Sequence, residues 1–72
     1  MAVYGLFKNK AFEPEAIVSM SRAYAEVCWE LGLGDGDRRE TSRVAKAVIE
    51  FAQRGARDHA RLRACVLEAL RN

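Results

Sequence analysis

The stretch Ser42–Gly55, SRVAKAVIEFAQRG, decides the fold of this 72-residue chain. Its apolar residues recur at three- and four-residue spacing, which places side chains along one side of an α-helix. These residues are Val44, Val48, Phe51, Ala52 and Gly55. Ala45 and Ile49 widen the apolar side enough to contact two neighbours. We therefore predict a helix that packs between the segments before and after it.

The segment before it is predicted to form a helix over residues 14–32. Pro14 suits the first helical position, because its missing N–H would be unpaired there anyway. Gly32, Gly34 and Gly36 are expected to end the helix and make the connection. A buried seam follows a 3-4-3-4 spacing and consists of Ile17, Met20, Tyr24, Val27 and Leu31.

Capping residues set the bounds of the other two helices. Asp37 and Glu40 have the spacing of a capping box, which predicts a middle helix over residues 38–54 that stops at Gly55. Asp58 is the expected N-cap of a third helix over residues 59–70. The inward stripe of that helix is predicted to be Leu62, Cys65, Val66, Ala69 and Leu70.

The predicted fold is all-α: a three-helix antiparallel bundle over residues 13–72, preceded by an irregular apolar N-terminal arm over residues 1–12. The arm shows neither strand alternation nor a helical stripe. Its large apolar side chains are too many to leave exposed to water, so we expect them to pack across the helices. They are Val3, Tyr4, Leu6, Phe7 and Phe12. A domain of this size buries only about 60% of its unfolded surface, so a partner or self-association is expected to matter for its stability.

The sequence indicates a cytoplasmic protein. No uncharged stretch approaches the ~20 residues that cross a bilayer, and the first 12 residues lack the apolar core of a secretory signal. Cys28 and Cys65 are therefore interpreted as reduced, buried residues. His59 is the only histidine, whereas a structural zinc site needs four ligands, so we expect no metal and no cofactor.

No constellation in the sequence predicts catalysis. His59 has no nucleophile within its sequence neighbourhood, and Asp58 beside it is expected to act as a cap. A calcium loop counted from Asp35 would need glycine at its sixth and glutamate at its twelfth position, where this chain has Glu40 and Lys46. No lysine followed by serine or threonine completes a phosphate loop. We therefore predict a protein that is not an enzyme.

The first helix carries a second apolar strip. Val18, Ala25 and Trp29 lie together about 100–160° from the centre of its buried seam, at 100° per residue. Either the N-terminal arm or another subunit is expected to cover this strip. The favoured function is a protein-protein interaction module that self-associates or binds a partner through the apolar patch near Trp29.

The alternative function is weak binding of nucleic acid or phosphate. Residues 37–72 carry nine Lys or Arg against five Asp or Glu, whereas residues 1–36 carry three against five. Arginine is a fork-shaped donor suited to phosphate. The candidate contacts of the second half are Arg54, Arg57, Arg61 and Arg63. A solvated basic face is the simpler interpretation of the same residues.

Two segments carry a family resemblance: AFEPEAIVSMSRAYAEVCWELG and RVAKAVIEFAQRGARDHARLRACVLEAL. They resemble small bacterial proteins and short domains of no assigned function. In these, a helix that opens at a Phe-acid-Pro-Glu start precedes an I-E-x-A-x-x-G turn and an R-L-R helix. The resemblance covers most of residues 11–70. It implies an all-helical fold and a bacterial source, and it brings no catalytic residues.

Overall fold

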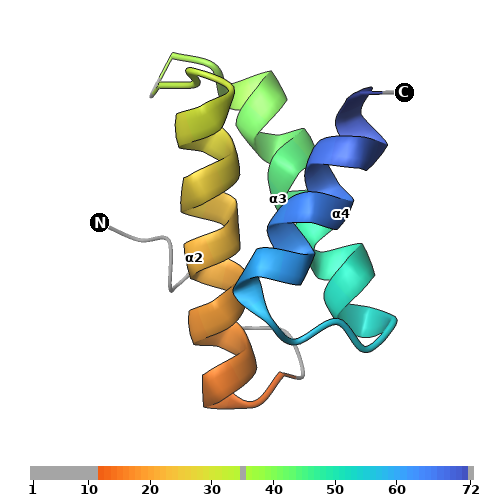
Figure 1. The fold of residues 1–72 in the computed structure, drawn as a ribbon. Coiled ribbons are helices and arrows are strands. Elements are labelled where there is room, and N and C mark those ends of the chain that lie inside the picture. The colour runs from red at the N-terminus through yellow and green to blue at the C-terminus, as the bar shows by residue number, and fades with distance from the viewer. Residues whose placement is uncertain (1–11, 35, 72) are drawn as a thin grey trace.

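A computed structural model describes residues 12–34 and 36–71 of the chain. The described part consists of three helices, α2 (Pro14–Glu30), α3 (Arg38–Gln53) and α4 (His59–Arg71). Successive helices run in opposite directions, and each packs against the other two (Figure 1). The predicted all-α antiparallel bundle is therefore confirmed, with every helix end within two residues of its predicted place. Most of the predicted arm, residues 1–11, lies outside the described residues.

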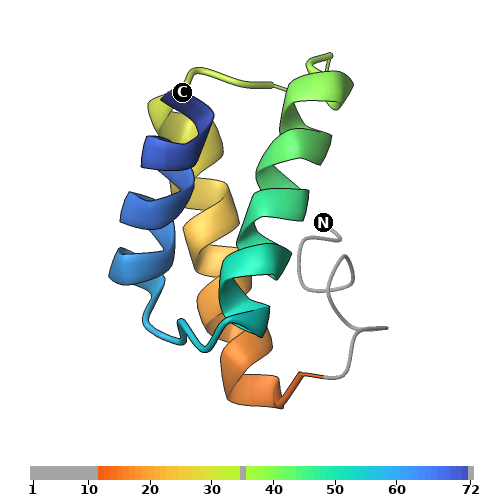
Figure 2. The same cartoon turned by 90° about the vertical axis from the view of Figure 1, so that its right-hand side faces the viewer.

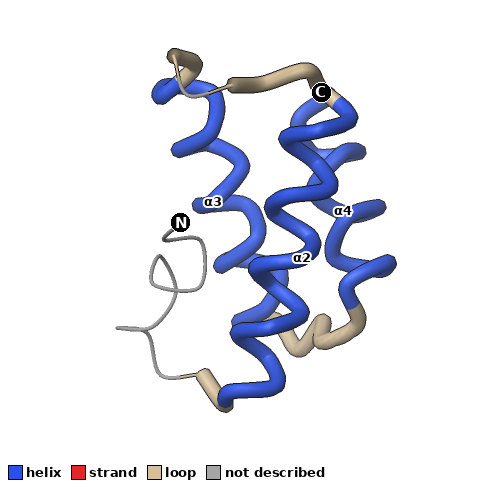
Figure 3. Tube along the Cα trace, turned by 90° about the vertical axis from the view of Figure 1, so that its left-hand side faces the viewer, coloured by secondary structure: helices blue, strands red, loops and turns tan. Residues whose placement is uncertain are grey.

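The three helices share one core but leave one face of α2 without a helical neighbour. Seen from the side of α3 and α4, α2 lies behind the other two helices (Figure 2). Seen from the opposite side, α2 lies in front (Figure 3). Its outer face is therefore turned away from both partners.

The core is formed by ten buried apolar residues. They are Ala16, Ile17, Met20, Ala23, Val27, Val44, Val48, Ala52, Leu62 and Val66. The α3 members Val44, Val48 and Ala52 are fully buried, as predicted for the middle helix. The alanines of α2 were not predicted, because the seam was assigned from its large side chains. Small residues at these positions allow neighbouring helices to approach closely.

The structure corrects several positions of the predicted core. Gly55 is exposed after the end of α3, and Tyr24, Cys65 and Leu70 are half-buried. Phe51 is half-buried rather than fully buried. Leu31 is 46% exposed, because it lies beyond the last turn of α2 as its C-cap residue. Ala69 is exposed, because α4 is rotated so that the larger Leu67 and Leu70 pack against the core in its place.

Gly32 and Gly55 end α2 and α3 in the same way. Both adopt left-handed backbone conformations, with φ of 69° and 108°. After α2, the Leu33 N–H donates to the Cys28 carbonyl at 2.9 Å and the Gly32 N–H donates to the Trp29 carbonyl at 3.1 Å. After α3, the N–H groups of Ala56 and Gly55 repeat this pair of bonds at 3.1 and 3.0 Å. Each helix thus ends in a Schellman motif, which pairs carbonyls that would otherwise lack a donor.

All three helices start at the predicted residues, but one of the predicted caps is wrong. Pro14 occupies the start of α2. The Asp58 carboxylate accepts the Arg61 backbone N–H at 3.1 Å and so caps α4. The capping box of Asp37 and Glu40 is wrong, because Asp37 makes no side-chain cap bond to α3. Its carboxylate instead accepts the Gly34 N–H at 2.8 Å, which closes the loop before the helix.

We predict that Gly55→Ala lowers the free energy of unfolding by about 1 kcal/mol, the usual penalty of a left-handed conformation for a residue with a Cβ. A Cβ at Gly55 would meet no atom within 4 Å, so the loss comes from the backbone and not from a clash. Urea denaturation followed by circular dichroism measures it. Gly34→Ala is the matched control, because Gly34 has equal space and a negative φ. An equal loss in both variants would contradict this explanation.

Candidate interaction surfaces

Val18, Ala25 and Trp29 form the first candidate surface, called here the Trp29 strip. Trp29 is 86% exposed and Val18 is 58% exposed, and Ala25 is exposed between them. With Leu31, Trp29 and Val18 are the exposed large hydrophobic residues of the described part of the chain. No described residue covers the strip. The predicted cover is the N-terminal arm, residues 1–12, of which all but Phe12 falls outside the described residues.

The shape of the Trp29 strip follows from its place on one helix. Val18 and Trp29 are 11 residues apart, which at ~1.5 Å per residue is roughly 16 Å along α2. The small side chain of Ala25 leaves a shallow place between these two larger ones. Along one edge runs an ion pair in which Arg22 Nε lies 3.2 Å from Glu26 Oε2. The strip is thus an apolar line with a charged border.

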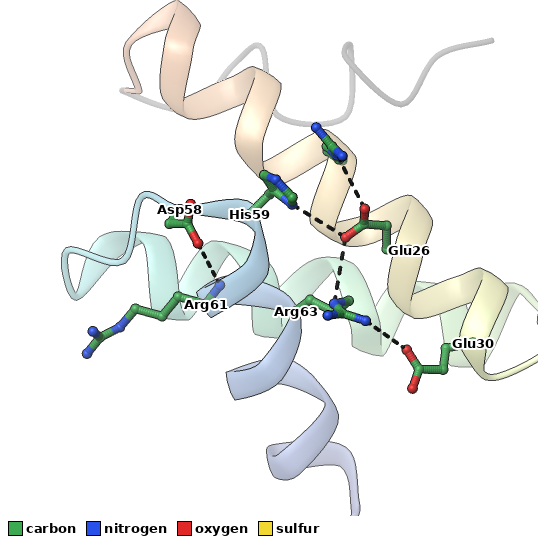
Figure 4. Close-up of polar contacts among 7 residues, drawn as sticks. Glu26, Glu30, Asp58, His59, Arg61 and Arg63 are labelled. Carbon is green, nitrogen blue, oxygen red and sulfur yellow. Dashed lines mark hydrogen bonds and ion pairs between the residues drawn. The ribbon is translucent and has the colours of Figure 1, made fainter.

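Glu26 is the centre of a polar cluster that joins α2 to α4 (Figure 4). Besides Arg22, its carboxylate receives two groups from α4, with His59 Nδ1 at 3.5 Å and Arg63 Nε at 3.7 Å. Arg63 Nη1 also lies 3.3 Å from Glu30 Oε1, one turn further along α2. The half-buried His59 therefore has a carboxylate partner on another helix, which its sequence neighbours did not reveal.

The groups around Glu26 lower the pKa of its carboxyl. Partial burial raises the pKa of the Glu26 carboxyl, but the hydrogen bond from Arg22 and the interactions with His59 lower it by more. The net result is a pKa below the ordinary value of 4.5. The carboxylate is therefore charged at neutral pH and pairs with the cations of both helices.

The second candidate surface is a hollow of about 530 Å³ at the turn between α3 and α4, called here the arginine hollow. Its lining residues come from the end of α3, the turn and the start of α4. They are Phe51, Arg54, Gly55, Ala56, Arg57, Asp58, Arg61 and Cys65. Three of the four arginines singled out in the sequence thus surround one hollow. The fourth, Arg63, faces α2 in the Glu26 cluster.

Two of these arginines are positioned by the structure around them. Arg57 donates from Nη1 to the Ala52 carbonyl near the end of α3, and its Nε lies 3.9 Å from Glu13 Oε1. Arg57 thereby adds a positive charge to the negative end of the α3 dipole. The guanidinium of Arg54 lies over the Phe51 ring, 5.3 Å from its centroid.

A second hollow lies at the other end of the bundle, with a volume of about 520 Å³. Its wall is mostly apolar, with a charged rim that includes Glu40, Arg43 and Arg71. The apolar residues are Leu31, Leu33, Val44, Leu67 and Leu70. The exposed Leu31 thus belongs to this end of the bundle and not to the Trp29 strip.

The two cysteines are free thiols in different settings. Cys28 is half-buried and packs against the core. Burial raises the pKa of its thiol, and a hydrogen bond with Tyr24 lowers it by less. The Cys28 thiol therefore stays protonated at neutral pH, when it is a poor nucleophile. Cys65, predicted to face inward, lines the arginine hollow because of the rotation of α4.

Two further properties concern the described residues alone. Across residues 12–34 and 36–71, no three or more His, Cys, Asp or Glu side chains gather where they could hold a metal ion. Within the same ranges, every helix is too short or too polar to cross a lipid bilayer.

Comparisons with protein-family models, curated proteins and solved structures find no match to this chain. The all-helical fold implied by its resemblance to small bacterial proteins is the fold that the structure has. The bacterial source stays a prediction.

We predict that Glu26→Gln lowers stability at pH 7 and that the difference from wild type shrinks in acid. Since folding lowers the Glu26 pKa, its stabilising contribution is present above the unfolded-state value near 4.5. It is lost as the pH falls from that value through the lower pKa of the folded chain. Urea denaturation of both proteins between pH 7 and pH 3 measures the difference.

Glu50→Gln is the control for this experiment. Glu50 is exposed and makes no ion pair with any described residue. Its removal is expected to change stability little across the same pH range. A Glu26→Gln defect that stays constant down to pH 3 would show that the charge of the carboxylate does not stabilise the fold.

Proposed function

We propose that this chain is a non-catalytic helical interaction module that binds through the Trp29 strip, with a second copy of itself as the partner. The observation that carries the proposal is the 86% exposure of Trp29, beside the exposed Val18, on a face that no described helix covers. The free thiols of Cys28 and Cys65 fit a reducing compartment, so we place the module in the cytoplasm.

A tryptophan in this position favours binding over a simple surface role. An aromatic side chain of this size buries 150–250 Å² when it is covered, and tryptophan is enriched among the residues that contribute most to protein interfaces. Val18 and Ala25 extend the apolar contact along the helix. The backbone groups at all three positions are hydrogen-bonded within α2 and its C-terminal cap, so a partner needs to contact only side chains.

The arrangement of the strip fits an antiparallel pairing of two α2 helices. In a two-fold symmetric interface, a residue that contacts a second residue of the partner is contacted by that second residue in return. A two-fold axis level with the bond between Ala23 and Tyr24 would set Trp29 of each copy opposite Val18 of the other. The small Ala25 near the axis would let the two helices approach closely.

The charges beside the strip complement each other in the same arrangement. Arg22 and Glu26 lie on one edge of the strip, 3.2 Å apart within the chain. The two-fold axis keeps this edge on the same side of both helices and brings Arg22 of one copy almost level with Glu26 of the other. Opposite charges across an interface favour one register over others. The proposed pairing therefore combines apolar contact along the Trp29 strip with charge pairing between Arg22 and Glu26 of the two copies.

The contact is expected to be weak. A standard interface buries about 800 Å² on each partner, which is more than three apolar side chains and their border supply. A dimer of this kind should form and dissociate with concentration.

We predict that Trp29→Ala weakens self-association by about 30-fold or more, corresponding to the loss of roughly 2 kcal/mol that defines an interface hot spot. Sedimentation equilibrium over a wide concentration range measures the dissociation constant. Trp29 is the only tryptophan, so a shift of its fluorescence with concentration reports its burial independently.

Leu31→Ala is the matched control, because Leu31 is an exposed large apolar residue outside the strip. It should associate like wild type. Circular dichroism should show the same helix content for all three proteins, since neither residue is part of the core. A wild-type chain that sediments as a monomer at every attainable concentration would contradict self-association.

A further inference from the structure

The arginine hollow holds more positive charge than its own residues neutralise. Three guanidinium groups line it, and they face two carboxylates: Asp58 in the described lining and Glu13, whose Oε1 lies 3.9 Å from Arg57 Nε. The Asp58 carboxylate already accepts the Arg61 backbone N–H as the cap of α4. Like charges brought close together raise the free energy of the fold, and a bound anion would relieve this cost.

The hollow has donors that remain available to a ligand. The guanidinium carbon of Arg54 lies over the Phe51 ring, and its N–H groups make no hydrogen bond or ion pair with a described residue. The Arg61 side chain makes no hydrogen bond or ion pair with a described residue and extends away from the Glu26 cluster (Figure 4). Arg57 is held by the Ala52 carbonyl and contributes its charge from a fixed position.

The local backbone also favours an anion over a cation here. The hollow adjoins the first turn of α4, a helix of 13 residues, where the helix dipole is positive. The opposing negative end of α3 is offset by Arg57, which binds the Ala52 carbonyl. The charge on both sides of the turn is therefore positive or neutralised.

We propose that the arginine hollow binds the phosphate group of a small phosphomonoester. Planar guanidinium groups match the oxygens of phosphate in pairs and bind it more strongly than neutral donors do. A volume of about 530 Å³ admits a phosphate group together with an organic part. Phe51 and Cys65 provide an apolar wall for that organic part.

The placement of Arg63 argues for a small ligand rather than a nucleic-acid backbone. A nucleic acid is held by many phosphate contacts along a basic track. Beyond Arg61, the next arginine of α4 turns to the other side of the helix and pairs with Glu26 and Glu30. The basic residues thus converge on one hollow and do not continue along α4.

The test is a titration of the full chain with phenyl phosphate, inorganic phosphate, acetate and a short DNA duplex at equal ionic strength. Nuclear magnetic resonance of the backbone amides reports both affinity and location. Phenyl phosphate and inorganic phosphate should shift the amides of residues 54–61, with the tighter binding for phenyl phosphate. Equal binding of acetate, or binding of the duplex alone, would overturn the proposal, as would the absence of any shift.

Two variants localise the site. Arg54→Gln and Arg61→Gln should each weaken phosphate binding roughly tenfold to a hundredfold, the loss expected for a hydrogen bond between charged groups. Arg57 is left intact because it caps α3. Arg39→Gln is the control, because it removes the same charge from an exposed position on α3 outside the hollow.

An equal loss of affinity in Arg39→Gln would show that net charge alone attracts phosphate and would overturn the site. Trp29→Ala should bind phenyl phosphate like wild type, since the Trp29 strip and the hollow share no residue. The proposed phosphate site and the proposed self-association are therefore tested independently of each other.

Discussion

The burial of one side of α3 against both other helices is the interaction on which the rest of the structure depends. Val44, Val48 and Ala52 are spaced four residues apart and are fully buried. The remainder of α3 is rich in charge, and isolated helices of this length are marginal in water. Contact with α2 and α4 is therefore what keeps α3 helical, and it aligns the other two helices at the same time.

A core of ten apolar residues leaves the polar contacts of the described part at the surface. The Glu26 cluster is the most extensive of these, and it joins two helices that are not consecutive in the chain. Apolar packing between α2 and α4 does not by itself fix how one helix is placed along the other. A carboxylate that meets His59 and Arg63 favours one placement, since a shift by one turn would separate the charges.

The features that suggest function lie on different parts of the bundle. The Trp29 strip runs along α2 from Val18, in the second turn of the helix, to Trp29 in its last turn. The arginine hollow is at a turn, where three arginines from different parts of the chain meet. Arg54 is the C-cap of α3, Arg57 lies in the turn, and Arg61 lies in the first turn of α4. The strip suits contact with a flat helical face, whereas the hollow suits a compact charged group. Both can be occupied in the same molecule.

For residues 12–34 and 36–71, the sequence by itself determined the three helices, their ends and the buried side of α3. These follow from local rules: the spacing of apolar residues, Pro14 at a helix start, and glycines that accept a left-handed backbone at Gly32 and Gly55. The strip near Trp29 was also predictable, because residues on one face of a helix have a fixed periodicity.

Only the tertiary structure decided how each helix is rotated about its own axis, and therefore which residues at the border of its apolar side face the core. In the observed orientation of α4, Ala69 and Cys65 lie away from the core, whereas Leu67 packs against it. This orientation also separates Arg63, which meets Glu26 and Glu30, from Arg61 beside the turn. Sequence spacing places residues on a helix but does not set the rotation of that helix against its neighbours. That rotation is fixed by the packing of all three helices together.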